Sequence, residues 1–315
     1  MSSKIWSPAS IPDLSGQTAV VTGANSGLGF EATRLLAANG ARVIMAVRSG
    51  ERGENAARRL REEGHEDLQV RELDLADLES VRAFATGVRE DLDRLDFLFN
   101  NAGVMAIPRE ETVDGFEKQF GVNHLGHFSL TVRLLPVLRE TPGETRIITQ
   151  SSGMHERGEI DFEDLQGEAD YDRWAAYAQS KLANVLFAFE LQRRLEAAGI
   201  EDVKSVAVHP GYADTDLQRR GPEKAGSTLR LWMMKAANTL VAQSARAGTW
   251  PMLYAATEPS IDGGEYVGPV GILNLRGPPG IQKPSERARD EDLAKRLWEV
   301  STALTGVSDD LDGPS

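Results

Sequence analysis

Short apolar runs alternate with longer amphipathic stretches along this chain, and the alternation limits the folds that it can adopt. The short runs have the length and β-branched content of strands, whereas the longer stretches repeat apolar residues at helical spacing. Strands separated by helices of this kind form βαβ units, whose parallel sheet is covered by helices on both faces. The sequence therefore predicts an α/β fold with a doubly wound parallel sheet.

The predicted elements extend through most of the chain without a linker, a repeat or a low-complexity tract. The strand-like runs are residues 18–21, 42–47, 68–73, 95–99, 146–149, 203–208 and 266–267. The predicted helices are residues 28–39, 51–63, 78–92, 175–198 and 290–302, with a further long helical stretch before 146. We therefore expect one domain at 15–277, an N-terminal extension at 1–14, and a C-terminal helix and polar tail at 278–315.

Composition excludes several classes of protein. The 315 residues carry a formal net charge of −13, so no broad basic face is available for nucleic acid or anionic membrane. The sequence contains no cysteine, which excludes disulfides, thiolate nucleophiles and cysteine-ligated metals. Residues 1–16 do not have the apolar core of a secretory signal, and nowhere is there an apolar run of about 18 residues. We expect a cytoplasmic protein with no nucleic-acid partner and no integral membrane contact.

A glycine-rich turn follows the first predicted strand and opens the first predicted helix. Its glycines allow a tight turn, close approach of the backbone and close packing of helix on strand, and a phosphate pair can lie at the helix N-terminus. This turn predicts a dinucleotide site; the alternative is a purely structural turn. The predicted contacts are Gly23, Asn25, Ser26, Gly27, Leu28 and Gly29.

The end of the second predicted strand bears on the choice between NAD and NADP. An acidic residue at this position binds the 2′-hydroxyl of NAD, whereas an arginine accepts the 2′-phosphate of NADP. Val47 and Arg48 stand here, and no carboxylate occurs before Glu51. Because a guanidinium pairs well with phosphate oxygens, we expect NADP in preference to NAD. The alternative is that Arg48 is a solvated loop charge.

Tyr177 and Lys181 lie four residues apart on a predicted helix, so both side chains project from one helical face. A phenol has a pKa of about 10, and a cation within about 4–6 Å favours the phenolate and lowers that pKa. Tyr177 can then donate a proton to a carbonyl oxygen as hydride arrives, or accept one in the reverse reaction. The alternative is that Tyr177 is a half-buried packing residue.

Two further polar residues complete the predicted catalytic set. Ser152 follows the fifth predicted strand, at the sheet edge where α/β sites form, and its hydroxyl can bind the substrate oxygen. Asn123 lies on the preceding long helix and can hold a water that links Lys181 to solvent. The alternatives are that Ser152 caps a helix and that Asn123 is a core amide with satisfied hydrogen bonds.

Six motifs in order resemble the short-chain dehydrogenase/reductase family, and the likeness covers residues 15–270. The motifs are Thr22-Gly23-x-x-x-Gly27-x-Gly29, Asp74-Leu75, Asn100-Asn101-Ala102-Gly103, Ser152, Tyr177-x-x-x-Lys181 and Pro210-Gly211-x-x-x-Thr215. The glycine spacing is similar to that of the short branch of the family, so the resemblance implies a single-domain Rossmann fold.

Longer strings at 22–29, 120–128 and 177–187 resemble the retinol dehydrogenase and WW-domain oxidoreductase group, which is also similar to protochlorophyllide reductase. The resemblance implies that NADP is the cofactor and that the protein forms a homo-oligomer. It implies that Asp74 contacts adenine, that Asn101 and Lys181 contact the riboses, and that Thr215 contacts the nicotinamide side. The implied contacts outside the glycine turn and Arg48 are Asp74, Leu75, Asn101, Ala102, Gly103, Tyr177, Lys181, Pro210, Gly211 and Thr215.

The likeness fades across 217–260, where the substrate loop of the group would lie. In this segment Leu229, Trp232, Met233, Ala236, Ala237 and Leu240 recur at helical spacing. The stripe fits an apolar lid over a lipophilic substrate, a surface for a second copy or a membrane, or an ordinary core-facing helix. His124 and His127 have the spacing of a metal pair, but because no third ligand is evident we predict no metal site.

These features together predict an NADP-dependent oxidoreductase that transfers a hydride between nicotinamide and the alcohol or carbonyl group of a small or lipophilic substrate. Tyr177 is the acid/base, Lys181 tunes it, Ser152 orients the substrate and Asn123 supports proton relay. The alternative from another class is a non-catalytic NADP-binding sensor or scaffold, which has no need of Ser152, Tyr177 and Lys181 together.

Overall fold

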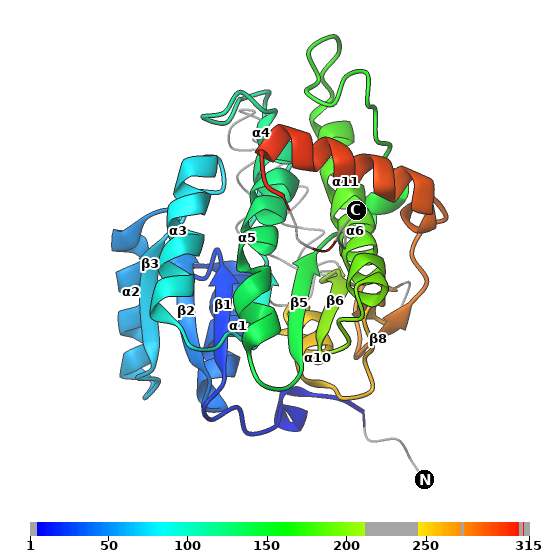
Figure 1. The fold of residues 1–315 in the computed structure, drawn as a ribbon. Helices are drawn as coiled ribbons and strands as arrows, with labels where there is room; N and C mark the ends of the chain where they lie inside the picture. The colour runs from blue at the N-terminus through cyan, green and yellow to red at the C-terminus, as the bar shows by residue number, and fades with distance from the viewer. Residues whose placement is uncertain (1–4, 212–244, 272–273, 309–310, 312–315) are drawn as a thin grey trace, which may run out of the picture.

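The computed structural model describes residues 5–211, 245–271, 274–308 and 311. Within these residues eight strands form one sheet in the order β3-β2-β1-β4-β5-β6-β7-β8 (Figure 1). Strands β1 to β7 are parallel, and β8 pairs antiparallel with β7. The predicted α/β fold with a doubly wound, mostly parallel sheet is confirmed.

The elements alternate along the chain much as their apolar patterns indicate. The strands are β1 (Thr18–Thr22), β2 (Arg42–Val47), β3 (Leu68–Glu72), β4 (Phe97–Asn100), β5 (Thr145–Gln150), β6 (Val203–Val208), β7 (Tyr266–Pro269) and β8 (Pro279–Gln282). The helices are α1 (Gly27–Ala38), α2 (Gly50–Glu62), α3 (Leu78–Asp91), α4 (Lys118–Phe120), α5 (Gly126–Glu140), α6 (Arg173–Ala197), α9 (Ala245–Gly248), α10 (Trp250–Thr257) and α11 (Glu291–Thr305).

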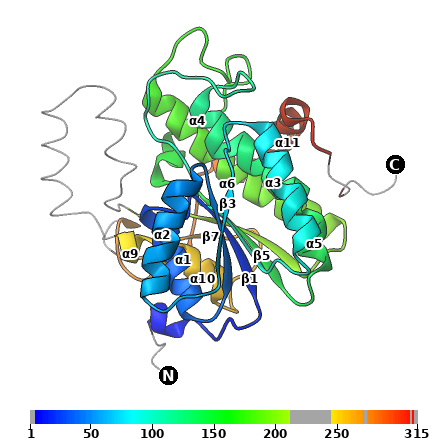
Figure 2. The same cartoon turned by 90° about the vertical axis from the view of Figure 1, so that its left-hand side faces the viewer.

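Helices cover both faces of the sheet, with α1, α2 and α10 on one side and α3, α5 and α6 on the other (Figure 2). Successive residues of β1 point to opposite faces: Val21 packs in the core that contains Leu36 of α1, and Val20 in the core that contains Leu134 of α5. All four side chains are completely buried. The sheet is therefore apolar on both faces, as a parallel sheet between two helical layers requires.

Helix α11 packs across α6 and the start of α5 and forms an additional layer over them (Figure 1). The Trp298 ring stacks on Phe187 at a centroid distance of 5.9 Å and meets the edge of Phe128 at 4.9 Å. The side chain of Asp290 accepts a hydrogen bond from the Leu293 N–H group and caps the helix, which ends at Gly306 with φ 63°. The expected C-terminal helix is present and continues to Thr305.

The segment before β1 is packed against the domain. Trp6, Ile11 and Leu14 are buried in the core on the α1 side of the sheet. The Trp6 ring meets the edge of Tyr254 in α10 at a centroid distance of 5.6 Å. These contacts join the described part of the N-terminal extension to the helical layer that α1 and α10 form.

Two local features differ from the pattern in the sequence. Strand β8 was not predicted because proline and glycine are depleted in strands, and Pro279 is tolerated here at the edge of the sheet. The long helical stretch before β5 is divided by a π-helical turn at Gly121–Leu125, between α4 and α5. Such turns occur frequently at functional sites, and this one carries Asn123.

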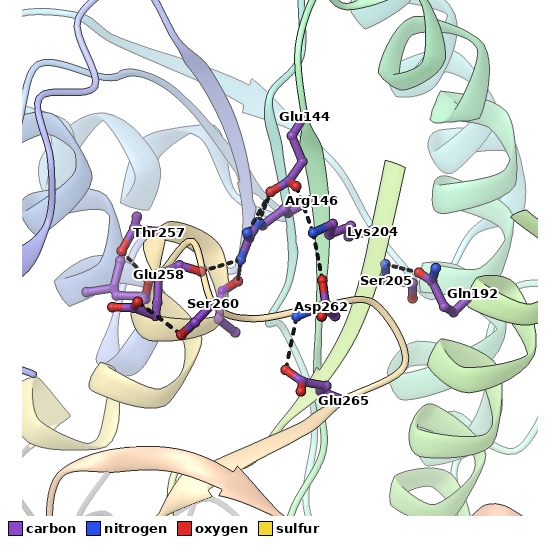
Figure 3. Close-up of polar contacts among 12 residues, drawn as sticks. Glu144, Arg146, Gln192, Lys204, Ser205, Thr257, Glu258, Ser260, Asp262 and Glu265 are labelled. Carbon is purple, nitrogen blue, oxygen red and sulfur yellow. Dashed lines mark hydrogen bonds and ion pairs between the residues drawn. The ribbon is translucent and has the colours of Figure 1, made fainter. Parts of the chain in front are cut away.

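A buried arginine joins α10 to the amino-terminal edge of the sheet (Figure 3). Arg146, at the start of β5, is 4% exposed and donates hydrogen bonds to the carbonyl oxygens of Ala255 and Glu258 at 2.8 and 3.0 Å. Its charge is paired with Glu144 at 2.6 Å, and Glu144 also pairs with Lys204 of β6 at 2.8 Å. Arg146 thus satisfies carbonyl groups that the end of a helix leaves without an intrahelical partner.

We expect Arg146→Ala to lower the free energy of unfolding by about 3 kcal/mol, because the carbonyl groups of Ala255 and Glu258 lose a donor and Glu144 keeps only Lys204 as a partner. The control is Arg82→Ala, whose ion pair with Glu79 is exposed and should contribute little to stability. Urea unfolding followed by circular dichroism measures both. Equal losses in the two variants would contradict a structural role for Arg146.

Candidate active site

A cavity opens at the carboxyl ends of β1, β2 and β4, where the strand order reverses. Ligands of open α/β sheets bind at such a switch point. The structure brings most of the predicted cofactor residues together in the cavity lining. These residues are Gly23, Asn25, Ser26, Gly27, Leu28, Arg48, Asp74, Leu75, Asn101, Ala102 and Gly103.

The backbone of the glycine turn adopts a conformation that would be strained for residues other than glycine. Gly23 and Gly27 have φ angles of 67° and 56°, which side-chain-bearing residues rarely adopt. Gly29 does not line the cavity, but a Cβ atom there would lie 2.5 Å from the Gly23 carbonyl oxygen and 2.6 Å from Nδ2 of Asn101. The missing side chain therefore allows α1 to approach both the turn and the loop that follows β4.

The start of α1 presents backbone N–H groups to the cavity. Ser26 occupies the N-cap position with an extended backbone, but its hydroxyl accepts no capping hydrogen bond from the helix. Serine at this position normally satisfies one of the free N–H groups of the first turn. These donors and the positive end of the helix dipole suit an anionic group such as a pyrophosphate.

Two arginines lie at the end of the cavity where the sequence predicts the adenosine part of the cofactor. Arg48 follows β2, and Arg52 lies one turn into α2; both are exposed and line the cavity. Arg52 was not predicted, although its spacing of four residues from Arg48 could have indicated it. Two guanidinium groups at one end of a cavity in an acidic protein form a local site for a phosphate.

The loops after β3 and β4 form the rest of the lining. The Asp74 carboxylate accepts a hydrogen bond from the Ala76 N–H group at 3.0 Å, which fixes the loop after β3. The Asn101 side chain donates to the Thr22 carbonyl oxygen at 2.8 Å and joins the loop after β4 to the end of β1. Gly103 joins this lining to the Lys181 side chain, because a Cβ atom at Gly103 would lie 3.6 Å from Nζ of Lys181.

Tyr177 and Lys181 project from α6 toward the end of β5, and both are buried, with 5% and 3% exposure. The Lys181 Nζ atom lies 5.7 Å from the centre of the Tyr177 ring and donates to the Gln150 carbonyl oxygen at 3.2 Å. Ser152 lies two residues beyond β5, and its hydroxyl is close enough to the Tyr177 phenol to lower the pKa of that phenol. The three predicted residues are thus assembled in one place.

Ser152 also has the structural role that we considered as an alternative. Its hydroxyl accepts the Met154 N–H group at 3.2 Å and caps the 3-10 turn Gly153–Arg157. The Ser152 carbonyl accepts from Nδ1 of His155 at 2.8 Å, while Nε2 of His155 accepts the Ser285 N–H group at 3.2 Å. His155 was not predicted, and it joins the catalytic serine to the segment before α11.

Burial shifts the pKa values of the catalytic pair in opposite directions. It raises the pKa of Tyr177 to about 12, and the hydrogen bond with Ser152 offsets only part of this rise. It lowers the pKa of Lys181 to about 8, because the charged form is penalised. We expected the lysine to lower the pKa of the tyrosine, but burial has the larger effect. At neutral pH Tyr177 is therefore a neutral phenol, suited to donate a proton.

Asn123 is completely buried, and both polar atoms of its side-chain amide make hydrogen bonds. Its Oδ1 atom accepts the Val104 N–H group at 2.8 Å, and its Nδ2 atom donates to the Val104 carbonyl at 2.9 Å and to Ser180 Oγ at 2.9 Å. Ser180 lies between Tyr177 and Lys181 in α6 and was not predicted. Asn123 therefore connects the loop after β4 with the catalytic helix; a role in holding a water stays a prediction.

The last predicted residues follow β6. Pro210 and Gly211 lie at its carboxyl end but do not line the cavity. The φ angle of Gly211 is 67°, and a Cβ atom there would lie 2.3 Å from the Leu275 carbonyl oxygen. Thr215 and the apolar stripe from Leu229 to Leu240 lie outside the described residues.

Comparison with known proteins agrees with this geometry. The sequence profile described as short chain dehydrogenase matches residues 17–226. The chain belongs to the short-chain dehydrogenase family. A short-chain dehydrogenase with this arrangement is an NAD(P)-dependent oxidoreductase that acts on alcohol or carbonyl groups.

Similar short-chain dehydrogenases match nearly the whole chain. Human retinol dehydrogenase 13 is 42% identical over 96% of this chain and 87% of its own length. Mouse polyprenol dehydrogenase is 41% identical over 95% of this chain and 87% of its own. A crystal structure of an uncharacterized protein from Mycobacterium paratuberculosis is 42% identical, with a TM-score of 0.79 over 97% of this chain and 99% of that one. The chain is thus retinol dehydrogenase-like.

In the described ranges of this short-chain dehydrogenase, no helix combines the length and the apolarity that are needed to cross a bilayer.

The pKa of Lys181 predicts how carbonyl reduction depends on pH. The ammonium form is present below a pH of about 8 and is lost above it, so kcat should fall as the pH rises from 7 to 9.5. Stopped-flow or steady-state rates with saturating cofactor and carbonyl substrate measure the profile. Lys181→Arg should remove this decline, because a guanidinium keeps its charge up to a pH of about 12. A decline with the same midpoint in Lys181→Arg would assign the titration to another group.

Proposed function

We propose that this short-chain dehydrogenase transfers a hydride between NADP and the alcohol or carbonyl group of a small or lipophilic substrate. The observation that carries the proposal is the assembly of Ser152, Tyr177 and Lys181, with Nζ of Lys181 next to Gly103 of the cavity lining. A non-catalytic sensor or scaffold would need the cavity but not the three catalytic side chains.

The cavity residues fit a dinucleotide along its length. Gly23, Ser26 and Gly27 leave backbone donors at the start of α1 for the pyrophosphate, and Asp74 lies at the adenine end. Asn101 and Lys181 are placed to hold the riboses near Gly103. When bound, the cofactor supplies or accepts the hydride at its nicotinamide ring. The two exposed arginines favour NADP over NAD, because they suit a 2′-phosphate better than a hydroxyl.

Tyr177 can transfer one proton to or from the substrate oxygen, and Ser152 can bind that oxygen. The neutral phenol of Tyr177 donates its proton to the substrate oxygen as the carbonyl carbon is reduced, and accepts a proton in the oxidation direction. The Ser152 hydroxyl, which lies near the phenol, can bind the same oxygen. The ammonium group of Lys181 stabilises the phenolate that remains after proton donation.

An apolar substrate fits the surroundings of Tyr177. Trp174, one turn before Tyr177 in α6, is 37% exposed and meets the edge of the Tyr177 ring at a centroid distance of 6.4 Å. Its aromatic surface can contact the hydrocarbon part of a substrate whose oxygen lies at the phenol. The named relatives act on retinol and polyprenol, which are apolar alcohols, and this agrees with the proposal.

The central test compares Tyr177→Phe with the wild type in NADPH oxidation by a panel of aldehydes and ketones of increasing chain length. We expect the substitution to lower kcat by about 100- to 10,000-fold, because the proton donor is lost, while the Kd of NADPH stays within about threefold. Tyr254→Phe, on the far side of the sheet, is the matched control and should keep full activity. Tight NADPH binding without turnover by the wild type on any substrate would favour the sensor instead.

Cofactor choice is tested by Arg48→Ala and Arg52→Ala. Each substitution should raise the KM for NADPH by about tenfold or more and leave the KM for NADH nearly unchanged, because only NADPH carries the 2′-phosphate. Arg58→Ala is the control, since Arg58 is exposed on α2 but does not line the cavity. An equal rise in both KM values would show that the arginines do not select the phosphate.

A further inference from the structure

The imidazole of His127 is held between two segments of the active site. His127 lies in the first turn of α5 and is 1% exposed. Its Nδ1 atom is 3.1 Å from the carbonyl oxygen of Asn123, and its Nε2 atom is 2.9 Å from Oγ1 of Thr22 at the end of β1. One side chain therefore spans from the π-helical turn to the strand that leads into the glycine turn.

The donors and acceptors around Thr22 assign one tautomer to His127. The Asn123 carbonyl can only accept, so Nδ1 carries the proton. Burial and the nearby charge of Lys181 lower the pKa of His127 to about 4, so the ring is neutral and Nε2 accepts. The Thr22 hydroxyl then shares its proton between Nε2 and the Phe99 carbonyl oxygen at 3.1 Å, and it accepts the N–H groups of Asn101 and Ala102, both at 2.9 Å.

This assignment uses every polar atom of the imidazole and the hydroxyl. A hydroxyl has one proton and two lone pairs, and the N–H groups of Asn101 and Ala102 occupy both lone pairs of Thr22. The opposite tautomer would place a bare Nδ1 against the Asn123 carbonyl, and its Nε2 proton would find no free lone pair on Thr22. The Thr22 proton lies between two acceptors, Nε2 and the Phe99 carbonyl oxygen, so these contacts favour the Nδ1–H tautomer of His127.

The imidazole of His127 connects segments whose relative positions matter for the proposed reaction. Thr22 precedes the glycine turn, Asn101 and Ala102 line the cofactor cavity, and Asn123 holds Val104 and Ser180 beside the catalytic pair. Lys181 is close enough for its charge to act on His127. Displacement of the ring would therefore be transmitted to the cofactor loop and to the catalytic helix together.

We propose that His127, as a neutral Nδ1–H tautomer, is a positioning residue that locks the cofactor loop after β4 to the π-helical turn that carries Asn123. The proposal rests on the proposed function, because it concerns the same site. His127 is not among the residues that line the cavity, and it acts through Thr22 and Asn123. The neighbouring His124 does not share this role, since its Nε2 atom is 2.8 Å from Ser301 of α11.

The first test observes the tautomer directly in the wild-type protein. Long-range ¹H–¹⁵N correlation spectra, with the His127 signals identified by their absence in His127→Phe, should show Nδ1 protonated and Nε2 unprotonated at pH 7. They should remain so down to pH 5.5, where exposed histidines are largely charged. An Nε2–H tautomer, or a charged ring at pH 7, would overturn the proposal.

The second test removes each end of the connection. His127→Phe keeps the ring volume, and Thr22→Val keeps the shape of the side chain; each should lower kcat/KM for NADPH by about 10- to 100-fold, because buried partners are left unpaired. The double variant should lose little more than either single variant, since both changes break the same connection. Thr22→Ser, which keeps the hydroxyl, should remain within about threefold of the wild type.

Thr141→Val is the matched control for a lost buried hydroxyl. Thr141 is 4% exposed and its hydroxyl accepts the Leu95 N–H group at 2.8 Å, at the far end of α5. It should lose stability without loss of kcat/KM. If Thr22→Val and His127→Phe lose only thermal stability, as Thr141→Val does, or if their effects multiply, the proposal fails.

The measurements separate this proposal from the proposed function. If the wild type binds NADPH but reduces no carbonyl compound, the proposed function fails. The tautomer and the Kd of NADPH, which both variants should raise by about tenfold, still decide the role of His127. If the wild type turns over and both variants match it in Kd and kcat, His127 is a packing residue and only this proposal fails.

Discussion

The close approach of α1 to the loop after β4 is the constraint on which the site depends. At Gly29 the backbone of the helix comes so near to the Gly23 carbonyl and the Asn101 amide that no side chain fits between them. This approach places the start of α1 beside the carboxyl ends of β1 and β4. The cavity lies where these segments meet, since Gly23, Gly27 and Asn101 all line it.

The chemistry of the site comes from burial more than from neighbouring charge. Tyr177 and Lys181 are both removed from water, and desolvation moves the phenol and the ammonium group toward their neutral forms. Their pKa values therefore move apart, to about 12 and about 8, whereas an ion pair would lower the pKa of the phenol and raise that of the ammonium group. The site is prepared as a proton donor, with a lysine that is charged at neutral pH and loses its charge in mildly alkaline solution.

The sequence was most informative where one physical requirement dominates. Apolar runs between amphipathic stretches located seven parallel strands, because a sheet buried on both faces needs continuous apolar segments. The glycine turn, Ser152, Tyr177 and Lys181 could be predicted because each depends on a short motif. Strand β8 could not be, since its pairing with β7 is a tertiary contact that overrides the preferences of Pro279 and Gly280.

Site residues whose role depends on partners far away in the sequence were harder to predict. Arg52 becomes relevant only when α2 brings it to the end of β2. His127 was considered as half of a metal pair with His124, because a spacing of three residues places both on one helical side. In the structure the two rings point to different partners, Thr22 and Ser301, which no local pattern indicates.

The packing of α11 has a consequence for the order in which the protein is made. Trp298 closes the outer side of Phe128 and Phe187, and Ser301 holds the ring of His124, next to Asn123 in the π-helical turn. Synthesis proceeds from the N-terminus, so these contacts form only after residues 291–305 have left the ribosome. Helices α5 and α6 therefore acquire the support of α11 late, after all eight strands of the described sheet have been translated.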